Sequence, residues 1–90
     1  MKPLRWTFHA RKKATVRKID PREVEDAITN PDRILPGQPP RKVHVRRYHD
    51  RELGVDMLLC AVVEETQQER VIVTVYRTSK FEKYITEGKQ

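Results

Sequence analysis

The run Met57–Val63 limits the fold most strongly, because every one of its residues is apolar. A half-buried strand alternates apolar and polar residues, whereas a strand covered on both faces does not. The run is far shorter than the roughly 20 residues that a membrane span needs. It therefore predicts the centre of a longer strand over Val55–Glu64. A chain of 90 residues is long enough for one core, so we expect a single domain over residues 1–90.

Two further segments have strand character, Lys42–His49 and Arg70–Thr78. They are joined to the central strand by short connections near Arg51–Gly54 and Glu65–Glu69. Short connections favour an antiparallel meander. Leu4–Phe8 is either a fourth short strand or an extended lead-in that places its aromatic residues against the core.

Two helices are expected before the strands. His9–Lys18 contains no Gly or Pro and is rich in Ala, Lys and Arg, which favours a helix. The second helix has a strong start signal: Asp20 as the N-cap, Pro21 at the first helical position and Glu23 at the third. This helix must end near Asn30, because a proline follows and disfavours helical geometry before it.

The remaining segments complete the predicted fold. Asp32–Arg41 contains Pro-Gly and Pro-Pro pairs and is expected to be a loop, and Lys80–Glu87 is expected to form a short closing helix. The prediction is an α+β domain with two N-terminal helices, an antiparallel β-meander of three strands (four if Leu4–Phe8 joins) and a short C-terminal helix.

The net charge of +6 is unevenly placed along the chain. Residues 1–19 carry seven cations and no carboxylate, residues 20–33 are mainly acidic, and residues 41–51 are basic again. This order indicates a surface that faces a polyanion and an opposite acidic side, although a solvated charged surface would have the same composition. The lone Cys60 gives no intrachain disulfide and, with no secretory signal after Met1, favours a cytoplasmic protein.

The first predicted helix carries one candidate site. His9, Lys13 and Arg17 are spaced i, i+4 and i+8 and so fall on one side of a helix. A neutral imidazole beside two cations could accept a proton from a ribose 2′-OH, while the cations stabilise charge on the phosphate. His9 could equally cap or pack at the start of the helix, with the cations solvated.

The end of the last predicted strand carries a second candidate. Tyr76, Arg77, Thr78, Lys80 and Tyr84 lie within nine positions and could hold and polarise a phosphate without a metal. Tyr76 and Thr78 should share one face of the strand and Arg77 the other. The ordinary polar end of a strand would look the same.

In the strand Lys42–His49, one face alternates cations with His44 and ends in an aromatic ring. Arg46 and Tyr48 on that face could contact phosphate and stack on a base. An edge strand kept soluble by charged side chains would have the same residue pattern. The three histidines lack the spacing of metal ligands, so neither a metal nor another cofactor is expected.

Several motifs together resemble one family of small bacterial domains, the domain of unknown function numbered 4258. The family's pattern is also similar to the BrnT-like and RelE/ParE-like toxin folds. The matching segments are Phe8-His9-Ala10-Arg11, Arg17-Lys18-Ile19-Asp20, Glu23–Asp32 and Val73–Thr78, with Lys80 and Tyr84 after them.

The resemblance implies a RelE/BrnT-like fold and an RNA-binding domain similar to the metal-independent endoribonucleases of toxin–antitoxin systems. RNA and an antitoxin-like protein are the implied partners. A non-catalytic module that binds nucleic acid or protein is the alternative. The residues expected to take part in catalysis are His9, Arg17, Arg77 and Lys80. Those expected to contact nucleic acid are Arg11, Lys13, Arg46, Tyr48, Tyr76, Thr78 and Tyr84.

Overall fold

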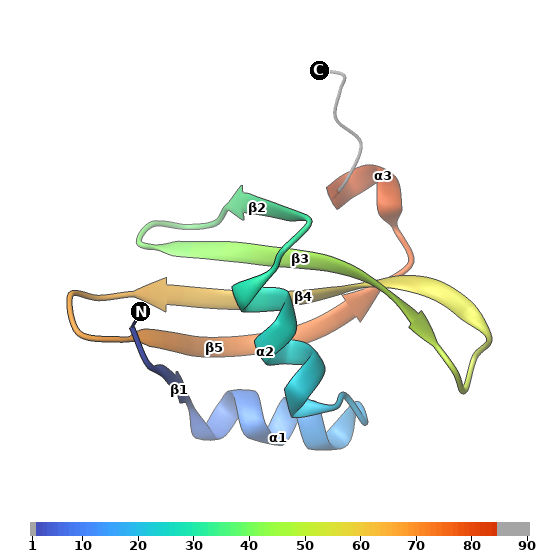
Figure 1. The fold of residues 1–90 in the computed structure, drawn as a ribbon, viewed down its shortest axis with the longest axis horizontal. Coiled ribbons are helices and arrows are strands. Elements are labelled where there is room, and N and C mark those ends of the chain that lie inside the picture. Colours follow the sequence, from blue (N-terminus) through green and yellow to red (C-terminus); the bar gives the residue numbers. More distant parts are fainter. Residues whose placement is uncertain (1, 85–90) are drawn as a thin grey trace.

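Five strands form one mixed sheet in the order β1-β5-β4-β3-β2 (Figure 1). The structure is a computed structural model that describes residues 2–84, apart from the Lys83 side chain. The elements along the chain are β1 (Leu4–Trp6), α1 (Phe8–Val16), α2 (Pro21–Thr29), β2 (Arg33–Pro36), β3 (Arg41–Asp50), β4 (Val55–Glu65), β5 (Arg70–Thr78) and α3 (Phe81–Tyr84).

The apolar run lies in β4, the middle strand, as the sequence predicts. β3 and β5 flank β4 and are antiparallel to it. The pairing of β4 with β5 changes register between Val62 and Val63, which marks an irregularity in the ladder. Leu58, Leu59, Cys60 and Ala61 in β4 are at most 1% exposed. Consecutive buried residues of this kind require cover on both faces of the sheet.

The predicted fold class is wrong, because the sheet is mixed and five-stranded instead of a meander of three or four antiparallel strands. β1 joins the sheet as a parallel neighbour of β5, with Leu4 opposite Arg70 and Trp6 opposite Ile72. β2 forms antiparallel to β3 inside the segment expected to be a loop. Pro36 is its last residue and Pro31 lies two positions before it, and these prolines hide its strand character in the sequence.

The predicted C-terminal helix is corrected as well. α3 is a single four-residue turn and not a closing helix. The rest of the predicted helix over Lys80–Glu87 lies outside the described residues. The two N-terminal helices are present, and α2 begins as expected: the Asp20 side chain accepts a hydrogen bond from the Arg22 backbone N–H at 2.9 Å, and Pro21 is the first helical residue.

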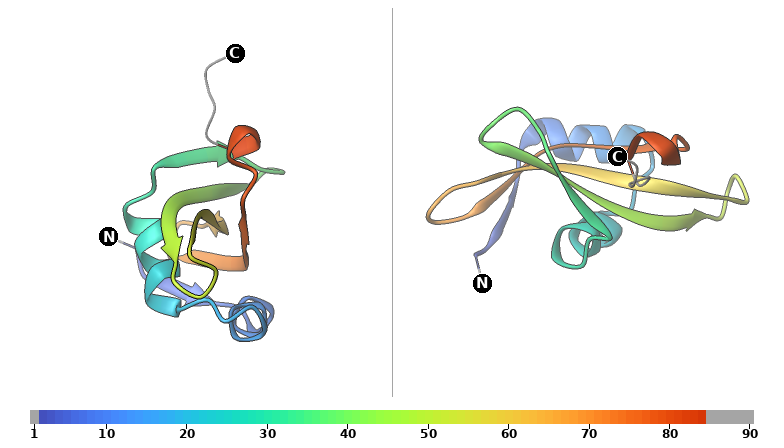
Figure 2. Two further views of the ribbon diagram at one scale, coloured as in Figure 1. Left: turned by 90° about the vertical axis from the view of Figure 1, so that its right-hand side faces the viewer. Right: turned by 90° about the horizontal axis from the view of Figure 1, so that it is seen from above.

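Apolar side chains pack on both faces of the sheet. On one face, Val24, Ala27 and Ile28 of α2 are buried against a cluster that includes Leu59 and Ile72. On the opposite face, a smaller cluster is formed by Val45, Leu58 and Cys60, with Phe81 and Tyr84 of α3 packed against it. The left view of Figure 2 shows α2 and α3 on opposite sides of the curved sheet.

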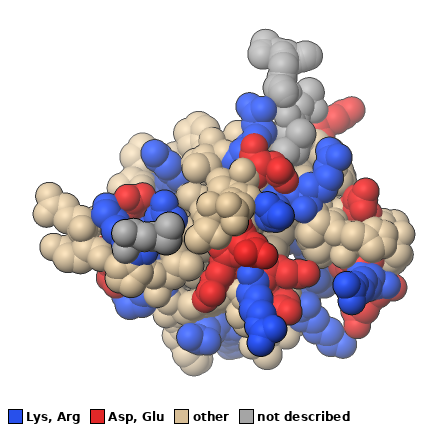
Figure 3. All heavy atoms as spheres, in the orientation of Figure 1, with Lys and Arg blue, Asp and Glu red and all other residues tan. Residues whose placement is uncertain are grey.

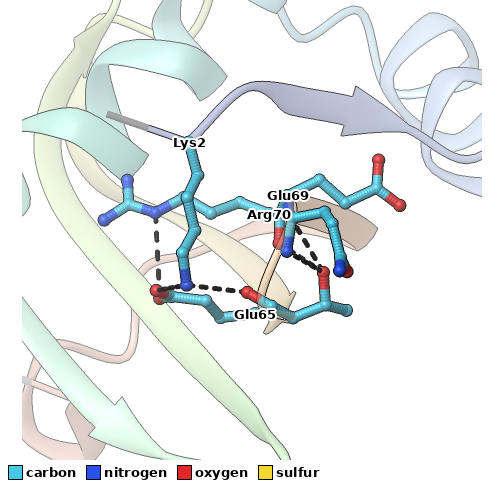
Figure 4. Close-up of polar contacts among 6 residues, drawn as sticks. Lys2, Glu65, Glu69 and Arg70 are labelled. Carbon is cyan, nitrogen blue, oxygen red and sulfur yellow. Dashed lines mark hydrogen bonds and ion pairs between the residues drawn. The ribbon is translucent and has the colours of Figure 1, made fainter.

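Ion pairs and hydrogen bonds connect β1 and the residues before it to the turn between β4 and β5. Lys2 Nζ lies 2.8 Å from Glu65 Oε2 and donates to the Thr66 carbonyl at 2.7 Å. Arg5 Nε lies 3.0 Å from a carboxylate oxygen of Glu69. Figure 4 shows Lys2 and Arg70 beside Glu65. Each exposed pair contributes only about 0.2–1 kcal/mol, so together they reinforce the parallel pairing of β1 without creating it.

α1 covers the part of the β5 edge that β1 leaves open. β1 pairs with β5 only as far as Ile72. Beyond that point the Thr7 hydroxyl donates to the Ile72 carbonyl at 2.8 Å, and Arg17 Nη1 donates to the Val75 carbonyl at 2.8 Å. An unpaired edge strand is a template for aggregation. These contacts cover the open part of the β5 edge and hold α1 alongside β5 (Figure 1).

Candidate nucleic-acid interface

α1 contributes mainly two small residues to the core. Thr7 caps the helix by accepting a hydrogen bond from the Ala10 backbone N–H at 3.0 Å. Ala10 and Ala14 are buried and are the residues of α1 that pack into the core cluster. Alanine lets the helix lie close to β5. The longer side chains of α1 therefore remain available at the surface of the protein.

Those longer side chains are mostly cationic. We define the α1 surface by Phe8, Arg11, Lys12, Lys13, Val16, Arg17 and Lys18. Within residues 2–84, none of its five cations lies in an ion pair. Lys2, Arg5, Arg41, Arg70 and Arg77, by contrast, each lie within 4 Å of a carboxylate oxygen. The positive charge of the α1 surface is thus not neutralised by paired carboxylates.

Acidic and basic side chains gather on different parts of the molecular surface. Figure 3 shows acidic side chains gathered near the middle of the molecule, where α2 lies, with cations around them and along the lower edge, where α1 lies. The acidic residues of α2 include Glu23, Glu25 and Asp26. Glu25 accepts a hydrogen bond from the Trp6 indole at 3.3 Å, and Arg11 lies over the same indole at 5.4 Å. The two helices therefore carry opposite charge, with cations on α1 and mainly carboxylates on α2.

Apolar side chains are exposed among these cations. Phe8 is 83% exposed and Val16 is 68% exposed. Phe8, Lys12 and Val16 are spaced i, i+4 and i+8 and so share one side of α1. Burial cannot explain an aromatic ring in this position. A flat ring next to cations is the combination on which an unpaired base stacks while its phosphates are neutralised.

A second polar cluster lies at the end of β3. Asp50 is only 7% exposed, and its carboxylate takes part in several polar interactions. Its Oδ1 atom accepts hydrogen bonds from the backbone N–H groups of Glu52 and Leu53, both at 3.0 Å. Its Oδ2 atom accepts from the Tyr48 hydroxyl at 3.4 Å and lies 3.7 Å from Arg77 Nη1. Asp50 thus connects the β3–β4 turn to β5.

The cluster has a defined ionisation state near neutral pH. Backbone hydrogen bonding from Leu53, opposed by partial burial and assisted by Arg77, lowers the pKa of Asp50. Burial raises the pKa of the Tyr48 hydroxyl, although Arg77 acts in the opposite direction. Asp50 is therefore an anion, and Tyr48 is a neutral hydroxyl that can donate a hydrogen bond.

The faces of β5 divide as the sequence predicts. Tyr76 packs against the cluster of Val45, Leu58 and Cys60, whereas Arg77 reaches Asp50 on the side that holds α2. The Tyr76 hydroxyl donates to the Tyr84 hydroxyl at 3.3 Å. Burial raises the pKa of Tyr76, so its phenol stays protonated. It is not suited to act as a base.

The structure does not bring the four residues expected to be catalytic into one pocket. Arg17 donates to the Val75 carbonyl, and Arg77 is held beside Asp50. His9 is exposed near the start of α1, level with the early part of β5, and Lys80 is exposed beyond the end of β5. At about 3.3 Å per residue, the length of strand between these levels is roughly 25 Å.

The residues expected to contact nucleic acid are dispersed. Arg11 and Lys13 belong to the α1 surface. Arg46 Nη1 donates to the Asn30 carbonyl at 2.6 Å, and Tyr48 belongs to the Asp50 cluster. Thr78 accepts a hydrogen bond from the Lys80 backbone N–H at 3.0 Å, while Tyr76 and Tyr84 lie on the face away from α2. Of these seven residues, only Arg11 and Lys13 belong to the α1 surface.

Sequence reasoning missed Asp50 and the exposed Phe8. A signal for Asp50 was present: an Asp precedes the turn residues Arg51–Gly54, and its side chain accepts hydrogen bonds from the turn, as Asp often does. Phe8 gave no such signal, because an aromatic residue is usually buried. Among residues 2–84, no three His, Cys, Asp or Glu side chains are grouped to hold a metal, and no helix there is long and apolar enough to cross a membrane.

These features define a class of small domain in which a mixed five-stranded sheet carries a basic helix along one edge. The chain belongs to the family described as domain of unknown function (DUF4258), whose model matches residues 6–77. Comparison with curated proteins and with solved structures gave no match.

Proposed function

We propose that this protein binds single-stranded RNA through the α1 surface. The observation that carries the proposal is that five cations lie on and just after α1 with no ion-pair partner within residues 2–84, next to the exposed ring of Phe8. Cations neutralise phosphates and release condensed counterions, which supplies affinity independent of sequence. The Phe8 ring adds stacking on an unpaired base.

The preference for single strands follows from the exposed aromatic ring. Bases inside a duplex are already stacked and cannot lie on Phe8 without being unpaired. The preference for RNA over DNA rests on the similarity of the family's motifs to toxin folds. An antitoxin-like protein partner would be acidic and would compete with RNA for the α1 surface.

Binding without cleavage is the form of the proposal that the geometry supports better. Cleavage would need a proton acceptor and phosphate-stabilising cations around one scissile bond. His9 and Lys80 lie at different ends of β5, and the guanidinium of Arg17 is engaged with a strand carbonyl. The non-catalytic reading therefore requires no rearrangement of the fold.

The test is a binding titration with a fluorescent single-stranded RNA, followed by anisotropy. Phe8→Ala should weaken binding at least about fivefold, the lower limit for loss of one stacked base. Lys12→Gln should weaken it as well. Arg22→Gln removes an exposed cation from α2 and is the matched control, which should bind like the wild type. Equal affinity for all four proteins would contradict the proposal.

A parallel incubation separates binding from cleavage. The wild type and His9→Ala are held with the same RNA in EDTA, and the RNA is analysed by electrophoresis. We expect intact RNA with both proteins. Cleavage by the wild type that His9→Ala abolishes would overturn the non-catalytic form and support the metal-independent ribonuclease.

A further inference from the structure

The protein has a polar pocket of about 400 Å³ between the turn that joins α1 to α2 and the hairpin that joins β3 to β4. We call it the Arg77 pocket and define it by Lys18, Glu23, Tyr48, Asp50, Glu52 and Arg77, which line it with neighbouring residues. Its volume falls in the range of small-ligand sites, roughly 300–1,000 Å³. The α1 surface leads into it, because Lys18 belongs to both.

Arg77 has hydrogen-bonding capacity left for a ligand. Its side chain is only 26% exposed, and its ion-pair partner, Asp50, is 3.7 Å away, beyond a direct hydrogen bond. Arg77 also interacts with the Tyr48 hydroxyl. A guanidinium has five N–H donors, so these two neighbours leave most of them unused. Free guanidinium donors suit a phosphate, which Arg can bind through two parallel hydrogen bonds.

Three other charged side chains of the pocket, Lys18, Glu23 and Glu52, can also contact a ligand. Lys18, in the left-handed region with φ of 56°, has no ion-pair partner within residues 2–84. In the same part of the chain, the side chains of Glu23 and Glu52 accept no hydrogen bond. Asp20 and Asp50, by contrast, are occupied by backbone N–H groups. The pocket therefore offers Lys18 and the unused N–H donors of Arg77 to an anion, and the carboxylates of Glu23 and Glu52 to N–H donors.

We propose that the Arg77 pocket binds one nucleotide of the RNA, with its phosphate on Arg77 and Lys18 and an amino-bearing base against Glu23 or Glu52. Carboxylates accept hydrogen bonds from the exocyclic amine of cytosine, whereas uracil has an oxygen at that position. The pocket should therefore prefer cytidine to uridine nucleotides. This inference rests on the proposed RNA binding and adds a base preference to it.

The test is calorimetric titration of the full chain with cytidine 5′-monophosphate and, separately, with uridine 5′-monophosphate and inorganic phosphate. We expect the cytidine nucleotide to bind most tightly. Arg77→Gln and Lys18→Gln should each weaken binding of the cytidine nucleotide about tenfold, because each loses a hydrogen bond to a charged group. Glu23→Ala together with Glu52→Ala should bring the cytidine and uridine nucleotides to equal affinity. Equal binding of both nucleotides and phosphate by the wild type would overturn the proposal.

Two controls make the outcome decisive. Arg77→Gln leaves Asp50 without its cation and could fail to fold, so Lys18→Gln, at an exposed position, tests the same phosphate contact independently. Lys12→Gln should weaken binding of the long RNA and leave the cytidine nucleotide unaffected. Long RNA that binds while the nucleotide does not would overturn only the pocket. Failure of long RNA to bind would overturn the proposed function itself.

Discussion

The guanidinium of Arg77 lies 3.7 Å from the carboxylate of Asp50, so the end of β5 and the end of β3 are connected across β4. The same carboxylate receives the two backbone N–H groups of the following turn. One buried anion therefore fixes the β3–β4 hairpin and orients the arginine that faces the pocket.

Replacing Asp50 should destabilise the protein more than replacing any exposed acid of the same hairpin. In Asp50→Ala the turn N–H groups of Glu52 and Leu53 lose their acceptor and Arg77 loses its counter-charge. Asp56→Ala is the matched control, because its partner His49 and Asp56 itself are 60% and 62% exposed. Thermal unfolding of both variants checks this. A larger loss in Asp56→Ala would contradict the role given to Asp50.

Enlarging Ala14 should separate α1 from β5. Ala14 is 3% exposed in the core cluster, and Ala14→Leu forces extra volume into a packed interface at a cost of about 1–3 kcal/mol. The free energy of unfolding from urea titration is the measurement, with Thr15→Leu at the neighbouring exposed position as the control. A cost for Ala14→Leu no greater than that of the control would show that the helix is not closely packed.

Stability should decline as pH falls below about 6.5, because of His44. His44 is 6% exposed, and burial together with the nearby Arg70 lowers its pKa below 6.5. Below pH 6.5 the unfolded chain binds a proton at His44 that the folded chain excludes. Each pH unit therefore lowers the free energy of unfolding by up to about 1.4 kcal/mol, until the pKa of His44 in the folded protein is reached.

The pH effect is checked by urea unfolding between pH 7.5 and 5.5 for the wild type and two variants. His44→Gln should flatten the dependence on pH. His9→Gln, at an exposed position, should leave it as in the wild type. If the slope survives in His44→Gln, another group is responsible for it.

The Cys60 thiol should be unreactive in the folded protein. Cys60 is fully buried, and burial raises its pKa to about 11. The thiolate is the reactive form, so alkylation near pH 8 should require unfolding. Iodoacetamide labelling followed by mass spectrometry, with and without urea, measures this. Rapid labelling of the folded protein would mean that the face carrying α3 opens readily.

The central strand and the start of α2 could be predicted because local rules decide them. An apolar run has to lie inside a sheet, and an Asp-Pro pair followed by an acid starts a helix. β1 and β2 could not be predicted in the same way. β1 is three residues long and is held by Arg70 and its neighbours, about 65 positions later in the chain, and β2 forms among prolines because β3 offers it an edge.

The candidate site was predictable in part for a similar reason. Periodicity correctly separated Tyr76 from Arg77, since faces alternate along a strand. It could not place His9 relative to Lys80, because that relation depends on how α1 lies along β5. Nor could it find Asp50, whose importance arises from contacts with a turn and with another strand.

The salt dependence of RNA affinity tests the central claim most directly. For single strands, each neutralised phosphate contributes about −0.7 to the slope of log affinity against log salt concentration. If the α1 surface binds RNA, the triple variant Arg11→Gln, Lys12→Gln and Lys13→Gln should bind more weakly, with a slope shallower by about 2. Arg22→Gln should keep the wild-type slope. A triple variant that binds with the wild-type affinity and slope would contradict the account.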